Sequence, residues 1–139
     1  MKKITQTLLL LLVLVASVSS CKKSSDPAVA PAVAIIGKWK AVSASVSFLG
    51  QESNSPIDAC AADDITEFFT SPKVTVTDGA LKCDPSDPAV TNGSYTLSAD
   101  GKTLVLDGFT QTVVELSPST MKLKMDILGI PLTTTYSKI

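Results

Sequence analysis

Cysteines and carboxylates are the side chains of this sequence whose types could carry out chemistry. The chain has 139 residues, three cysteines and no histidine, and its 12 basic residues are all lysines. Histidine is the commonest general base and the commonest metal ligand, so catalysis would depend on carboxylates, lysines or hydroxyls alone. We therefore expect a protein without enzymatic activity.

Acidic residues gather in two segments, each beside a cysteine. They are Asp58, Asp63, Asp64 and Glu67 around Cys60, with Asp84 and Asp87 after Cys83. Calcium loops need oxygen ligands at a fixed spacing, and no Asp-x-Asp-x-Asp-Gly pattern occurs. A glycosidase would need a buried acid and an aromatic-rich cleft, but the chain has one Trp, two Tyr and four Phe. We expect solvated or loop-capping carboxylates, with no metal ion and no cofactor.

The balance of charge argues against nucleic acid as a partner. The 12 basic residues are matched by 13 acidic residues, and the formal net charge is -1. Proteins that bind nucleic acid present a basic stripe, and arginine supplies bidentate contacts to phosphate. Because the sequence has neither feature, we expect no binding to nucleic acid.

The N-terminal segment has the pattern of a secretion signal. Lys2 and Lys3 precede an apolar run at residues 8–15, and small residues then lead to Cys21. The apolar core of about a dozen residues is shorter than the ~20 that span a membrane; an uncleaved anchor is the alternative. Val18-Ser19-Ser20-Cys21 resembles the lipobox of bacterial lipoproteins. The resemblance implies removal of residues 1–20, a diacylglycerol on the Cys21 thiol and an acyl chain on its amine.

Residues 21–34 have the composition of a tether. Lysine, serine, proline and alanine dominate this segment, with no apolar periodicity that could bury a face. Two or more acyl chains hold a protein durably on a membrane, so we expect membrane attachment through Cys21. A lysine after the cysteine, Lys22, resembles lipoproteins that are sorted to the outer membrane. Whether the domain faces the periplasm or the cell surface stays open.

Residues 35–139 are expected to form one all-β domain. Runs rich in Val, Thr, Ile and Leu are punctuated about every eight to twelve positions by Gly, Pro, Asp, Asn or Ser. The expected strands are 37–48, 65–70, 73–77, 94–98, 102–106, 109–116, 120–127 and 132–138. Residues 80–83 are expected to continue the pairing, whereas 50–56 and 84–93 are expected to be non-strand. Eight strands joined neighbour to neighbour favour an up-and-down antiparallel meander closed into a small barrel, because closure leaves no unpaired edge.

The first expected strand changes its apolar face midway. Trp39 and Ala41 share one face, whereas the later alternating apolar positions, from Val42 to Phe48, share the other. A pattern with a period of two residues changes face only at a bulge or a sharp bend. We therefore expect this strand to turn a corner of the barrel.

Several short elements resemble the lipocalin-like domains of bacterial envelope lipoproteins. They are Ile36-Gly37-Lys38-Trp39, Cys60, Asp63-Asp64, Phe68, Cys83, Gly93-Ser94-Tyr95 and Asp100-Gly101-Lys102. The resemblance covers most of residues 35–139. It implies that a Gly-x-Trp element opens a short β-meander barrel.

Cys60 and Cys83 remain once Cys21 is acylated. An even number of thiols in an oxidising compartment predicts a disulfide between them. Chain entropy gives this closure a value of roughly 3 to 3.5 kcal/mol. A redox role is the alternative, but the two residues do not form a Cys-x-x-Cys pair.

The interior of the expected barrel is the candidate ligand site. Its expected lining residues are Trp39, Phe68, Tyr95, Met121, Leu123 and Met125. An eight-stranded barrel is just wide enough to be filled by side chains or to hold one small ligand. Two functions are therefore left open. One is binding of a small hydrophobic ligand, and the other is a structural or interaction subunit with a filled barrel that contacts an envelope partner through residues 50–56 and 84–92.

Overall fold

The computed structural model describes residues 30–139. The predicted signal peptide, Cys21 and most of the predicted tether lie outside the described residues, so the lipidation of Cys21 stays a prediction. The last residues of the segment predicted as a tether form a short helix, α2 (Pro31–Ala34), directly before the first strand.

Nine strands and a second short helix follow α2 in the described part of the chain. The strands are β1 (Gly37–Phe48), β2 (Gln51–Ser55), β3 (Ile65–Phe68), β4 (Lys73–Thr77), β5 (Val90–Leu97), β6 (Thr103–Leu106), β7 (Phe109–Leu116), β8 (Thr120–Ile127) and β9 (Ile130–Lys138). The helix α3 (Ala59–Ala62) lies between β2 and β3.

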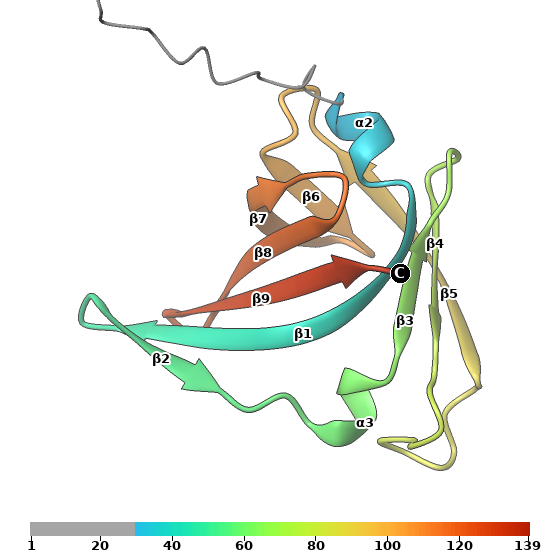
Figure 1. Cartoon of the computed structure of the whole chain (residues 1–139), viewed down its shortest axis with the longest axis horizontal. Helices are drawn as coiled ribbons and strands as arrows, with labels where there is room; N and C mark the ends of the chain where they lie inside the picture. Colours follow the sequence, from blue (N-terminus) through green and yellow to red (C-terminus); the bar gives the residue numbers. More distant parts are fainter. Residues whose placement is uncertain (1–29) are drawn as a thin grey trace, which may run out of the picture.

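Eight of these strands close an antiparallel barrel. β1 pairs with β3, each later strand pairs with the next, and β9 returns to pair with β1. β2 lies outside this ring and pairs with the second half of β1. Figure 1 shows α2 at one end of the barrel and the β1–β2 hairpin projecting at the other. The predicted all-β, up-and-down meander closed into an eight-stranded barrel is confirmed.

β1 turns a corner of the barrel near its middle. Residues Gly37–Trp39 pair with β3, whereas Ala44–Phe48 pair with β2. The pairing of β1 with β9 shifts register between Ala41 and Ser43, and Val42 between them is 56% exposed. A bulge lets the apolar pattern change face without slipping the rest of the strand. The predicted bend is confirmed.

Two segments differ from the sequence-based expectation. One is in the first hairpin, and the other follows β4. Residues 50–56 contain β2, because Leu49 and Gly50 both have positive φ and form a tight hairpin turn. Residues 80–83 form no strand. The carboxylates of Asp63 and Asp64 accept hydrogen bonds from the N–H groups of Leu81 and Gly79, so side chains take the place of strand pairing there.

The expected long loop at residues 84–93 is shorter than predicted. β5 begins at Val90, and Val90–Gly93 pair with Val74–Thr77 of β4. Proline and aspartate before Ala89 gave a strong loop signal. That signal does not mark the residue at which backbone pairing resumes.

The core fills the half of the barrel next to α2. It contains Ile35, Trp39, Phe68, Val74, Tyr95, Leu104, Val113, Met121 and Leu123. Trp39 is fully buried, and its Nε1 donates a 2.7 Å hydrogen bond to the carbonyl of Ile35. The Nζ atom of Lys138 lies 4.9 Å from the centre of the Trp39 ring and donates a 2.9 Å hydrogen bond to the carbonyl of Ala34. These contacts tie both ends of the domain to the end of the barrel next to α2.

Candidate binding site at the open end of the barrel

A cavity of about 600 Å³ opens in the half of the barrel away from α2. It is lined mainly by Leu106, Phe109, Gln111, Met125, Ile127 and Leu128. Leu106 pairs with Phe109, and Gln111 pairs with the core residue Leu104. Directly paired residues point to the same face of a sheet, so these side chains face the barrel interior.

A second cavity of about 340 Å³ lies against the opposite wall, formed by β1, β3, β4 and β9. The small side chains of Ala41 and Ala44 line it, together with Leu132 and Tyr136. Burial raises the pKa of the Tyr136 phenol, which keeps this hydroxyl neutral. Leu132 pairs with Met125 across β9 and β8, so the two cavities are neighbours in the same open half.

Three hairpins of the barrel share one turn geometry. Each has a residue with positive φ followed by a positive-φ glycine: Leu49-Gly50, Asp107-Gly108 and Leu128-Gly129. Such turns favour Asn, Asp or Gly at the first position, and a leucine in the left-handed region costs about 1 kcal/mol or more. Leu49 is 87% exposed and Leu128 is 98% exposed. Burial in the fold therefore does not offset that cost.

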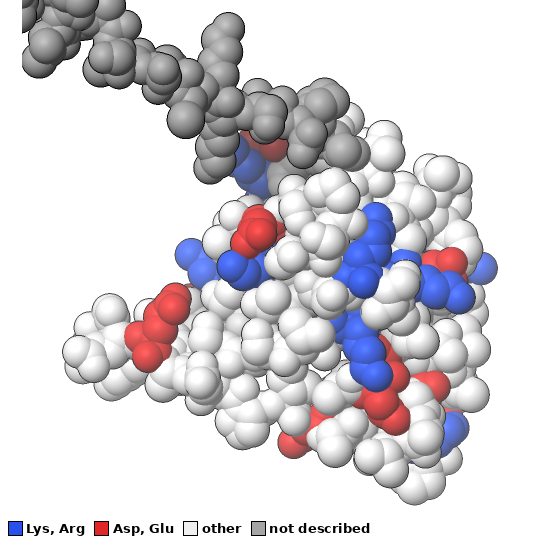
Figure 2. Space-filling view, in the orientation of Figure 1, with Lys and Arg blue, Asp and Glu red and all other residues white. Residues whose placement is uncertain are grey.

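These leucines belong to an exposed apolar rim, which we define as Phe48, Leu49, Phe109, Ile127, Leu128 and Ile130. Every member is at least 43% exposed. Figure 2 shows the projecting end of the β1–β2 hairpin as mostly uncharged, with acidic atoms beside it. Contiguous exposed apolar surface marks sites of interaction. Sequence reasoning missed the rim, although the Leu-Gly steps between strands were a signal for it.

Two carboxylates beside the larger cavity are held by hydrogen bonds from backbone N–H groups. Asp126 Oδ1 accepts a 2.7 Å hydrogen bond from the N–H of Gly129, and Asp107 Oδ1 accepts one of 2.7 Å from Ser94. The Asp107 carboxylate occupies the space where a side chain at Gly93 would lie. Gly93 pairs with the core residue Val74, so this space is on the inner face of the barrel. Glycine is therefore needed at this position.

The six predicted ligand-binding residues separate into different environments. Four of them, each at most 4% exposed, are packed in the core: Trp39, Phe68, Met121 and Leu123. Tyr95 is buried and donates a 2.6 Å hydrogen bond to the carbonyl of Phe69. Met125 lines the cavity of about 600 Å³. A ligand-binding role stays a prediction for all six. Of these, only Met125 lines either cavity of the open half, whereas Tyr95 lines a separate cavity of about 590 Å³ beside α2.

Cys60 in α3 and Cys83 in the loop after β4 are paired at disulfide distance. Their Cα atoms lie 5.2 Å apart, so the predicted pairing is confirmed. Ala61, next to Cys60, lines the cavity of about 340 Å³. The disulfide therefore fastens a loop that borders this cavity.

Three of the six acidic residues near the cysteines, Asp63, Asp64 and Asp84, accept hydrogen bonds from N–H groups of nearby loops. The hydroxyl and the N–H of Ser86 donate hydrogen bonds to Asp84 and lower the pKa of its carboxyl group. Asp63 Oδ2 caps the loop after β4, while its buried Oδ1 has no hydrogen-bond partner among the described residues. Between residues 30 and 139, no three metal-ligating side chains are grouped to hold an ion.

Comparisons with known proteins identify no relative of this chain. No protein-family model, curated protein or solved structure matches it. Within residues 30–139, the structure has no helix with the length and apolar character needed to cross a bilayer. The closed eight-stranded antiparallel barrel is consistent with a lipocalin-like fold.

Proposed function

We propose that this protein is a non-enzymatic, lipid-anchored protein of the bacterial cell envelope that binds a small hydrophobic ligand in a lipocalin-like barrel. The observation that carries the proposal is the cavity of about 600 Å³ at the open end. Ligand sites are commonly about 300–1,000 Å³ and mostly apolar. The side chains of Leu106, Met125 and Ile127 give this cavity that character.

The different ends of the barrel support a binding role over a purely structural one. In the half next to α2, Trp39 and its neighbours form a packed core that holds the strands in place. At the other end, the apolar rim stays in water. Covering such surface is favourable at about 25 cal/mol per Å², and an apolar ligand in the cavity would cover part of it.

The proposed anchor at Cys21 fits this arrangement. Support for the anchor comes from the sequence Val18-Ser19-Ser20-Cys21. The described chain enters the barrel through α2 at one end, so the tether would attach there and the opposite end would stay accessible. We propose the outer membrane as the site of attachment, with Lys22 as the supporting feature.

Fluorescence titration with N-phenylnaphthylamine, an apolar probe, tests the binding role. We expect saturable binding by the mature protein, and about tenfold weaker binding by Gln111→Trp, because that side chain faces the cavity. Thr112→Trp is the matched control, since Thr112 is the next residue of β7 and is exposed. Absence of saturable binding, or equal weakening by both variants, would overturn the proposal.

A role as an interaction subunit is the second candidate, and the exposure of Leu49 and Leu128 favours it. Apolar hairpin tips of this kind suit contact with another protein surface. The same titration separates the two candidates. A protein that binds no apolar probe but co-purifies from its own envelope with a stoichiometric protein partner would support the second.

A further inference from the structure

The two cavities of the open half contain no positive side chain. Among the described residues, the charged residues lining the larger cavity are Asp107 and Asp126, and Asp64 lines the smaller one. The sequence has no arginine or histidine that could contribute a cation. A carboxylate or phosphate head group in this half of the barrel would therefore have no opposite charge to bind.

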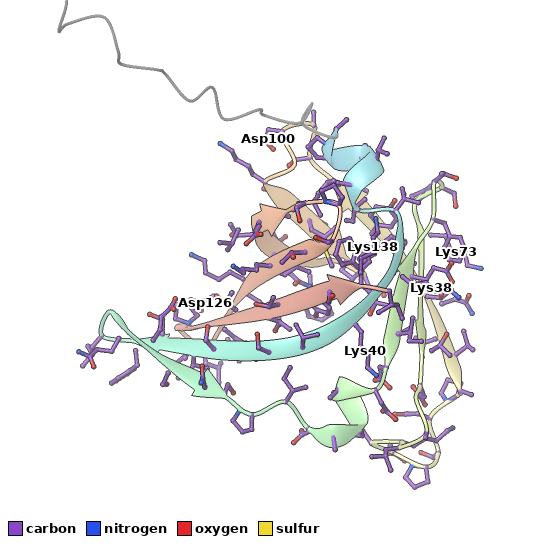
Figure 3. The ribbon with its side chains drawn as sticks, viewed as in Figure 1. Lys38, Lys40, Lys73, Asp100, Asp126 and Lys138 are labelled. Atoms are coloured by element: carbon purple, nitrogen blue, oxygen red, sulfur yellow. A yellow bond between two sulfur atoms is a disulfide. The ribbon has the colours of Figure 1, made fainter. Side chains whose placement is uncertain are left out.

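The lysines that are nearest in the sequence to the cavity-lining residues do not line either cavity. Lys122 and Lys124 alternate along β8 with the inward-facing Met121, Leu123 and Met125, and Lys122 makes a 2.7 Å salt bridge with Glu115. Lys138 lies over the Trp39 ring. Figure 3 shows Asp126 near the turn between β8 and β9, whereas Lys138 lies toward the other end of β9.

The carboxylates beside the larger cavity are fixed in place before any ligand arrives. Asp126 Oδ1 accepts a backbone hydrogen bond from Gly129 in its own hairpin turn, and Asp107 Oδ1 accepts one from Ser94 of the neighbouring strand β5. The space left by the missing side chain of Gly93 lets the Asp107 carboxylate lie against the inner wall. Phe109 lines the same cavity and is 69% exposed, so its ring is available to a cation.

We propose that the ligand is an amphiphile with a positively charged head group and one apolar chain. This inference rests on the proposed function and specifies the ligand class of the same site. The chain lies among Leu106, Met125 and Ile127, and the cation lies at the mouth of the cavity, which Asp107 and Asp126 line. An anionic head would be repelled by the two carboxylates and would lose hydration without gaining a partner.

Competition against N-phenylnaphthylamine tests this ligand class on the mature full chain. The competitors are dodecyltrimethylammonium, dodecyl maltoside and dodecanoate, which carry the same chain and are used below their micelle-forming concentrations. We expect the cationic competitor to bind at least about tenfold more tightly than dodecanoate, with the neutral one between them. Added salt should reduce the difference, because part of the preference comes from charge.

The variant Asp107→Asn/Asp126→Asn should lose this preference, because it removes both negative charges. Each asparagine keeps an oxygen that can accept the backbone hydrogen bond from Ser94 or Gly129. Asp100→Asn is the matched control, because Asp100 accepts similar turn hydrogen bonds between β5 and β6, near α2. If the double variant does not fold, Asp126→Asn alone and the salt series serve as the readout. Equal binding of all three competitors, or tighter binding of dodecanoate, would overturn the ligand class and leave the proposed function intact. Failure of the probe and of every competitor to bind would overturn both.

Discussion

Leu128 lies at the tip of the hairpin between β8 and β9, with φ of 54° and 98% exposure. Asparagine tolerates this backbone conformation better than leucine. We expect Leu128→Asn to raise the free energy of unfolding by about 1 kcal/mol, measured by urea denaturation. The matched control is Leu81→Asn, because Leu81 is 54% exposed and lacks a positive φ; it should give no such gain. A less stable Leu128→Asn protein would show that the leucine is not held at a cost.

The ionisation of the two tyrosines reports how deeply their rings are buried in the barrel. Desolvation raises the pKa of both Tyr95 and Tyr136 above the ordinary value of 10.0. Because the folded-state pKa is raised, folding favours the neutral phenol. The associated stability is present below pH 10 and is lost as the pH rises through the folded-state pKa.

The ultraviolet absorbance of tyrosinate measures this effect directly. At the ordinary pKa of 10.0, we expect less than half of the signal in the folded protein and about half in urea-unfolded protein. Tyr136→Phe should remove part of the alkaline loss of stability. Equal ionisation of the folded and unfolded proteins at that pH would contradict the burial of these rings.

α3 and the loop after β4 are held by the Cys60–Cys83 disulfide and by carboxylate caps rather than by sheet pairing. α3 has four residues, and the loop after β4 is capped by carboxylates rather than by strand hydrogen bonds. We expect Cys60→Ser/Cys83→Ser to lower the free energy of unfolding by about 3 kcal/mol. A reductant should destabilise the native protein by a similar amount and leave the variant unchanged. A reductant effect on the variant would show that another group is responsible.

Alternation of apolar and polar residues predicts those strands that bury one face along their whole length. In β8, Met121 and Leu123 alternate with Lys122 and Lys124, and the structure buries the apolar set. β2 could not be predicted in this way, because Gln51–Ser55 are polar on both faces. Its pairing depends on backbone hydrogen bonds to β1 and on the turn at Leu49-Gly50.

The candidate site could be predicted as the barrel interior, but not as one half of it. Inward-facing residues of β8 have the same alternation in both halves, so Met121 and Met125 look equivalent in the sequence. The difference arises at long range. In the half next to α2, Ile35 packs into the core. In the open half, the small side chains of Ala41 and Ala44 leave the space of the cavity of about 340 Å³.

At the scale of the whole molecule, the barrel combines a packed half next to α2 with an open apolar half. The core around Trp39 lies in the packed half, and Lys138 ties the last strand to Ala34 at the end of α2. The open end has two neighbouring cavities and an exposed rim. Ligand binding in the open half, as proposed, would therefore leave the core of the other half packed.

Nuclear magnetic resonance of methyl-labelled methionine tests this division most directly, because Met121 and Met125 lie on the same strand in the two environments. Met121 is 1% exposed in the core, and Met125 lines the cavity of about 600 Å³. Met125→Leu assigns the two signals. On titration with N-phenylnaphthylamine, we expect the Met125 methyl signal to shift in a saturable manner and the Met121 signal to stay in place. No shift of either signal, or a larger shift at Met121, would contradict ligand binding in the open half of the barrel.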